Sequence, residues 1–208
     1  MKKILLFATF IFACNACYTQ DKSNDYMKSN YEVFYDMCFG GMTFVDDFMT
    51  EYGKDITVVV NISGTEDIKK FLTGIIKQRF GSYRFLYSDK PDSGYFMLSI
   101  EDTDLILRYP EIVNRNVFSD DYIKRFLISS FKIRFLNEKG ELLKEKSFSK
   151  EYRDEINFVF LESAERSDFT FTKSAVPEKP FMSKIFVPAV VVAVSALTII
   201  LFFAIRSK

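Results

Sequence analysis

The sequence contains no histidine and no tryptophan among its 208 residues. Without histidine, the chain cannot form a Ser-His-Asp triad, a Cys-His pair, a histidine-ligated metal site or an imidazole pH switch. Net charge is absent too, because 28 basic residues balance 28 acidic ones, so the overall charge does not favour nucleic acid. We therefore expect a protein that is not an enzyme and has no cofactor, no metal and no nucleic-acid partner.

Cysteine is scarce as well, and Cys14, Cys17 and Cys38 are the whole set. Cys14 and Cys17 have the spacing of a redox or metal pair, but a structural zinc site needs a second pair, which the chain lacks. Residues 11–14, IFAC, resemble a bacterial lipoprotein box with an atypical phenylalanine, so Cys14 and Cys17 are candidate lipidation sites. Cys38 lies in a helical pattern and is predicted to be a small core residue.

The N-terminus has the layout of a secretory signal. Lys2 and Lys3 precede an apolar run over residues 4–13, and small residues follow it, which predicts a signal peptide over residues 1–16. An uncleaved N-terminal anchor is the alternative, although the run is short for a membrane span. Residues 17–30 are predicted to be a polar lead-in.

The C-terminus carries a long uncharged apolar run. Residues 185–205 contain no charged side chain, and as a helix they would be about 30 Å long, the thickness of a bilayer hydrocarbon core. They predict a single transmembrane helix, with residues 206–208 as a cytoplasmic tail; a buried soluble helix is the alternative. Residues 164–184, which include Pro177 and Pro180, predict an extended tether.

Small residues lie on one face of the predicted membrane helix, at Ala189, Ala193 and Ala196. Such residues allow another helix to approach closely in lipid. The alternative is a helix that only anchors the protein, because alanine is also common in such helices. Together with the signal peptide, the helix predicts a single-pass protein of the bacterial inner membrane with a periplasmic domain.

Residues 31–163 predict one exported α+β domain, with amphipathic helices on one face of a mostly antiparallel sheet. Apolar residues recur at helical spacing over 31–52, with an interruption near Gly40 and Gly41. The run 56–62 is nearly continuously apolar, as an interior strand would be, and Ser63 and Glu66 have capping-box spacing before the next helix.

The second half of this domain has the pattern of strands. Short strands are predicted at 83–87, at 95–100 and again at 105–109. The alternation in 122–136 predicts a strand with one buried and one wet face, and a turn at 137–140 leads to a returning strand over 141–148. Residues 151–167 fit either a last strand, which we favour, or a short helix.

Five acidic residues lie on either side of the strand predicted at 105–109, and they are Glu101, Asp102, Asp104, Asp120 and Asp121. Such a set is a candidate site for a hard cation or for a carboxylate-dependent hydrolase. Solvation of loops is the simpler interpretation, because no twelve-residue calcium loop accompanies the acidic residues.

The order of predicted elements over 56–150 resembles the small α/β modules of envelope assembly proteins, such as the lipopolysaccharide-assembly and curli-secretion lipoproteins. The tail is similar to that of a group of exported, tail-anchored proteins of Gram-negative bacteria. This similarity involves Phe171-Thr172-Lys173, Pro177, Pro180-Phe181, Ser183-Lys184, Leu201-Phe202-Phe203 and Arg206-Ser207-Lys208. The resemblance implies a location in the envelope and no particular chemistry.

These features favour a non-catalytic, membrane-anchored accessory protein of an envelope assembly or transport complex, with a protein partner and an exposed sheet that could accept a partner strand. The first alternative is a periplasmic domain that binds a small apolar ligand or lipid in a phenylalanine-rich groove between helices and sheet. The second alternative is the carboxylate-dependent hydrolase.

Overall fold

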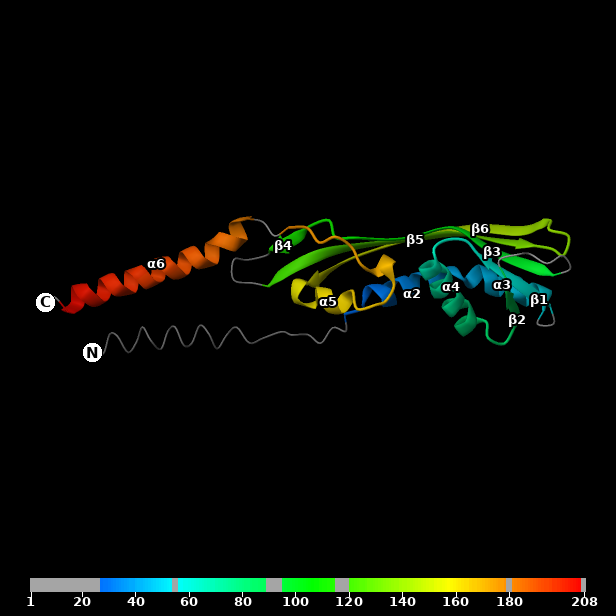
Figure 1. Cartoon of the computed structure of the whole chain (residues 1–208), viewed down its shortest axis with the longest axis horizontal. Helices are drawn as coiled ribbons and strands as arrows, with labels where there is room; N and C mark the ends of the chain where they lie inside the picture. The colour runs from blue at the N-terminus through cyan, green and yellow to red at the C-terminus, as the bar shows by residue number, and fades with distance from the viewer. Residues whose placement is uncertain (1–26, 54–55, 89–94, 115–119, 179–180, 207–208) are drawn as a thin grey trace.

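The structure is a computed structural model that describes residues 27–53, 56–88, 95–114, 120–178 and 181–206 (Figure 1). The predicted signal peptide, Cys14 and Cys17 lie outside the described residues. The described part contains one mixed, mostly antiparallel sheet, with helices packed on one of its faces, and a C-terminal helix. The predicted α+β class is therefore confirmed.

The sheet has the strand order β2-β1-β3-β5-β4, and β6 pairs with the other side of β5. The strands are β1 (Thr57–Ile62), β2 (Arg84–Tyr87), β3 (Phe96–Arg108), β4 (Ile112–Asn114), β5 (Asp121–Leu136) and β6 (Leu142–Asn157). β1 runs parallel to β2 and β3, and all other pairs are antiparallel. The long strand β5 is thus the centre of the sheet, with β3 and then β4 on one side and β6 on the other.

The helices on the sheet are α2 (Asn30–Gly41), α3 (Thr43–Tyr52) and α4 (Glu66–Arg79). The predicted break near Gly40 and Gly41 is confirmed. A Cβ atom on Gly41 would lie 2.7 Å from Cζ of Phe131, so the break brings the helix backbone against the sheet. The predicted cap of α4 is wrong: Thr65 caps the helix by accepting a hydrogen bond from the Ile68 amide at 3.4 Å, because Glu66 is already the first helical residue.

Every second side chain of β5 is part of the core. Side chains from Ile123 to Phe135 point alternately toward the helices, where they are buried, and toward the opposite face, where they are half-buried. Phe135 stacks on Phe48 of α3 with ring centroids 3.6 Å apart. The predicted phenylalanine-rich space between helices and sheet is therefore occupied by the protein's own rings.

Several strands differ from the prediction. β3 is continuous, whereas the sequence predicted a strand that stops at residue 100 and resumes at residue 105. A bulge at Asp102, with φ of 50°, keeps residues 101–104 within the strand, and aspartate tolerates this backbone conformation better than most residues. The short strand β4 was not predicted. β6 extends to Asn157 and is followed by η1 (Phe158–Phe160) and α5 (Leu161–Ala164), so residues 151–167 are strand in part and helix in part.

Part of the segment predicted to be an extended tether packs on the domain. The short helix η2 (Thr170–Thr172) follows Phe169, and Phe171 contacts Phe34 and Phe71 edge-to-face, with ring centroids 5.4 and 5.1 Å apart. Burial of these aromatic rings outweighs the preference of a proline-containing segment for extended chain. The domain therefore includes residues beyond 163.

The chain ends in the helix α6 (Phe181–Arg206), which lies beyond the sheet end that carries β4 (Figure 1). Its backbone agrees with the helix predicted over 185–205. Within the ranges that the structure describes, no helix satisfies both the length and the apolarity needed to cross a membrane.

Candidate functional site

The sheet has one covered and one open face. α2, α3 and α4 lie on the same side of it, and none of the described helices lies on the other side (Figure 1). Residues of β5 that point away from the helices alternate with the buried ones. We call the surface that they form with their neighbours in β1, β2, β3 and β6 the open face.

One end of the open face carries an apolar row. The pairing register aligns one apolar residue from each of five neighbouring strands, and these residues are Leu86, Val59, Met97, Leu136 and Leu142. The two outer leucines are 48% and 51% exposed, whereas Val59, the second residue of the row, is buried. Each end of the row thus leaves apolar surface in water that a partner could cover.

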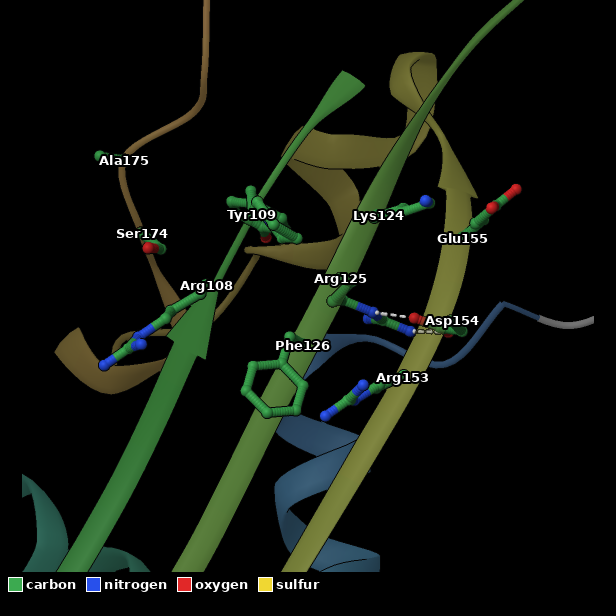
Figure 2. Close-up of a pocket in the computed structure, with 11 residues that line it drawn as sticks. Arg108, Tyr109, Lys124, Arg125, Phe126, Arg153, Asp154, Glu155, Ser174 and Ala175 are labelled. Carbon is green, nitrogen blue, oxygen red and sulfur yellow. Dashed lines mark hydrogen bonds and ion pairs between the residues drawn. The ribbon is translucent and has the colours of Figure 1, made fainter. Parts of the chain in front are cut away.

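The other end of the open face carries a pocket of about 890 Å³ where β3 ends beside β5 and β6 (Figure 2). The pocket is lined by Arg108, Tyr109, Pro110, Lys124, Arg125, Phe126, Arg153, Asp154, Glu155, Ser174 and Ala175. Four of these residues are basic and two are acidic, so the lining is cationic although the whole chain is neutral. Such a pocket favours an anionic ligand.

A buried ion pair lies beneath the pocket, on the helix side of the sheet. The Arg125 guanidinium donates two hydrogen bonds to the Asp154 carboxylate, from Nε at 2.8 Å and from Nη2 at 2.6 Å. Its Nη1 donates to the Lys28 carbonyl at 2.9 Å and to Oδ1 of Asn30 at 2.8 Å. Arg125 is 1% exposed. Because all three of its nitrogen atoms already donate to protein acceptors, Arg125 is a scaffold residue and is not free to hold a ligand.

Asn30 extends this network across the domain. Its Nδ2 donates to the Tyr109 hydroxyl at 2.8 Å and to the Thr172 carbonyl at 2.9 Å. Burial is the main cause that raises the pKa of Tyr109, so its hydroxyl stays protonated at neutral pH. The network therefore ties the start of α2, two strands and η2 together beneath the pocket, and it fixes the positions of the residues above.

The rim of the pocket carries the accessible cations. Arg108, Phe126 and Arg153 are aligned across β3, β5 and β6, and the Arg153 guanidinium lies 4.5 Å from the centre of the Phe126 ring. Lys124 pairs with Glu111 at 2.5 Å in an exposed ion pair, which raises the pKa of Lys124 mainly through the hydrogen bond. Arg108 is exposed and has no ion-pair partner within the described residues.

The structure does not bring together the acidic residues that the sequence singled out. Asp104 pairs with Ser130 of β5, whereas Asp121 begins the same strand, nine residues and about 30 Å away. Asp102 pairs with Lys132 at 3.3 Å and Glu101 with Arg134 at 3.4 Å. Over the described residues, no group of three or more potential metal ligands occurs. Glu101 and Asp102 therefore act as partners of sheet cations, and Asp120 and Asp121 accept hydrogen bonds from Asn157 and Asn114.

The other predicted residues have simple surroundings. Ala189, Ala193 and Ala196 are exposed on α6, and their predicted role in helix packing stays a prediction. Cys38 is buried in α2, where its Sγ lies 3.1 Å from Oγ of Ser129, as expected for a core residue. Burial raises the pKa of the Cys38 thiol to about 12.

Sequence reasoning missed the pocket, although one signal was readable. Arg125 occupies the same strand phase as Ile123 and Leu127, which are buried. A charged residue in the buried phase of an alternating strand needs a buried partner. The alignment of Arg108, Phe126 and Arg153 left no such signal, because it depends on strand register.

Neither a protein-family model nor a curated protein matches the chain. Solved structures that resemble it include a neuraminyllactose-binding hemagglutinin homolog from Helicobacter pylori, with 12% identity and a TM-score of 0.33, and a minor lipoprotein from Acinetobacter baumannii, with 8% identity and a TM-score of 0.32. The similarity covers 50% and 49% of this chain and 67% and 66% of the other two. At this level, neither fold nor function transfers to this chain, and the resemblances named from the sequence stay predictions.

Proposed function

We propose that this protein is a non-catalytic, membrane-anchored interaction protein of the bacterial cell envelope, an accessory subunit of an assembly or transport complex. The observation that carries this proposal is the open face of the sheet. It offers apolar surface at one end and a cationic pocket at the other, with ion pairs such as Arg134 and Glu145 between them. This mixture of apolar and charged surface suits recognition of a protein partner.

A partner would bind the face of the sheet more readily than its edge. The edge strand β6 has charged residues along most of its length, and it has exposed residues on both faces of the sheet. Such charges discourage the addition of another strand. The strand addition expected from the sequence is therefore the less favoured mode, and contact with the open face is the favoured one.

The membrane anchor in this proposal rests on residues 185–205. This run contains no charged residue, and α6 exposes large apolar side chains such as Val192 (68%) and Phe203 (65%). An apolar surface of this kind on a helix aggregates in water unless something covers it. A bilayer would cover it, and the signal-like N-terminus would direct the domain to the periplasm.

The surroundings of the charged groups support a non-catalytic role. The chain has no histidine, and the acidic residues considered for hydrolysis form two groups, one in β3 and one at the start of β5, about 30 Å apart. The buried Arg125–Asp154 pair is fully used in holding the strands together. Binding is the chemistry that the remaining exposed cations can perform.

Site-specific photocrosslinking in native membranes tests the proposal. A photoreactive amino acid at Ser130, in the centre of the open face, should give a specific adduct, as should one at Leu142. The matched control is Gln78, an exposed residue of α4 on the helix side. Adducts from Gln78 alone, or equal adducts from all three positions, would contradict a partner on the open face.

A further inference from the structure

We propose that the pocket between β3, β5 and β6 is a binding site for a phosphate ester, which Arg108 and Arg153 hold from opposite sides of the Phe126 ring. The site itself follows from the geometry of the rim. Only the lipid form of the ligand rests on the membrane anchoring proposed above.

The three rim residues form a cross-strand row. Arg108 pairs with Phe126, and Phe126 pairs with Arg153, so all three project from the same face of neighbouring strands. The two arginines therefore start about 10 Å apart. Figure 2 shows their guanidinium groups on either side of the Phe126 ring. Side chains of this length can converge on one small anion above the ring.

Both guanidinium groups are available to a ligand. Arg108 is exposed and makes no ion pair among the residues that the structure describes. Arg153 pairs with Glu151 at 3.0 Å, but the two side chains are 72% and 55% exposed, and such pairs contribute at most about 1 kcal/mol. A ligand can replace this pair, whereas it cannot recruit Arg125, whose donors are already used.

The shape of the site favours a phosphate ester. Each guanidinium presents paired N–H donors that match two oxygens of a phosphate, and the wall adds the hydroxyl of Ser174. Two guanidiniums and a hydroxyl supply donors for three oxygens, more than a carboxylate offers. Phe126, Pro110 and Ala175 line the same pocket and give apolar surface for the organic part of the ester.

The ester could be a lipid headgroup or a soluble molecule. Ala175 in the pocket wall precedes Phe181, the first residue of α6, by six positions, which is a reach of at most about 20 Å. If α6 is in the membrane, the pocket is held close to the headgroups of the bilayer. The same donors would bind a soluble phosphate ester, so the experiment needs two arms.

Native mass spectrometry of the full chain in a neutral detergent provides the lipid arm. Phosphatidylglycerol, which has a net negative charge, should be retained in preference to phosphatidylcholine. Calorimetric titration with glycerol 3-phosphate provides the soluble arm. We expect R108Q and R153Q each to weaken binding about tenfold or more, in the lipid arm if the ligand is a headgroup and in the soluble arm if it is a free ester.

The control is K132Q, which removes a cation of the open face outside the pocket, paired with Asp102. K132Q should bind like the unmodified chain, and circular dichroism should show that all three variants are folded. Equal binding by R108Q, R153Q and K132Q in both arms, or no binding to the unmodified chain in either arm, would overturn the site. A chain that binds glycerol 3-phosphate but is not membrane-bound would keep the site and refute the anchor.

Discussion

Arg125 is the largest fully buried side chain in the described part of the chain, and it occupies a position where the strand pattern calls for an apolar residue. Removing a guanidinium from water costs several kcal/mol unless it is paired and hydrogen-bonded. Asp154 supplies the opposite charge, and Lys28 and Asn30 accept the remaining hydrogen bonds. These contacts link segments that are distant in sequence, which is how one residue holds the base of the pocket.

Replacing Arg125 with Met should lower the free energy of unfolding by about 3–5 kcal/mol, because Asp154 would be left without its partner. The double variant R125M/D154L should recover a large part of this loss. The matched control is K124M, which affects the exposed neighbouring pair with Glu111 and should change stability by no more than about 1 kcal/mol. Urea unfolding of the full chain in detergent measures all three. Equal losses for R125M and K124M would show that the buried pair is not a structural centre.

Cys38 should be unreactive in the folded chain. Burial raises the pKa of its thiol from 9.0 to about 12, which lowers the thiolate fraction at pH 8 about a thousandfold. Because the folded pKa is the higher one, this contribution to stability is complete below pH 9 and is lost as the pH rises toward 12. In a C14S/C17S chain, a thiol reagent at pH 8 should modify Cys38 only after denaturant is added. Rapid modification of the native chain would mean that α2 does not pack on β5 as described.

At the scale of elements, the break between α2 and α3 fits the helices to the sheet. Gly41 lies so close to the sheet that an added Cβ would meet Phe131 at 2.7 Å and Phe148 at 3.0 Å. An added Cβ on Gly40, its neighbour, would meet nothing within 4 Å. The two glycines therefore have different roles, one for close packing and one that the helix does not require.

The variants G41A and G40A separate these roles. G41A should destabilise the domain by about 1–3 kcal/mol, because the new methyl group forces two phenylalanine rings aside. G40A should be neutral or stabilise it by up to about 1 kcal/mol, because alanine favours the helix more than glycine does. Thermal unfolding followed by circular dichroism compares them. The close contact would be refuted if G41A were at least as stable as G40A.

The elements that could be predicted from the sequence are those whose pattern has a single physical cause. The alternation of β5 reflects one buried and one half-buried face, and the nearly continuous apolar run of β1 reflects burial of Val58, Val59 and Val60 on both faces of the sheet. β6 was predicted too short because it is an exposed edge strand. It carries charged residues on both faces of the sheet, so its sequence shows no alternation of apolar and polar residues. The docking of Phe169 and Phe171 on α2 and α4 could not be predicted, because it depends on a surface that only the folded chain creates.

The same limit applies to the candidate site. A charged residue in the buried phase of β5 pointed to Arg125, and its partner Asp154 lies opposite it in the register of β6. The rim residues come from three strands, and no local pattern relates their positions. A shift in register by one residue would turn Phe126 to the other face, so the pocket is a property of the assembled sheet.

At the scale of the whole molecule, the open face and α6 raise the same physical question, which is what covers their exposed apolar residues. On the open face, single leucines at the two ends of a row are exposed, which a soluble protein tolerates. On α6, exposed large residues follow one another from Val191 to Phe203. Under the proposed anchoring, a bilayer would cover the exposed residues of α6, whereas those of the open face would need no cover other than a partner.

We therefore expect the full chain to remain with membranes after extraction with alkaline carbonate, which releases peripheral proteins. Lysine at the centre of a membrane helix costs about 2.5–3.5 kcal/mol, so the double variant V194K/L197K should be released. The control E178K adds a lysine before α6 and should stay bound. Protease added to the periplasmic side should then digest the domain and leave a small fragment that contains residues 185–205. Release of the unmodified chain by carbonate, or equal retention of V194K/L197K in a chain that also carries C14S/C17S, would contradict a membrane-spanning α6.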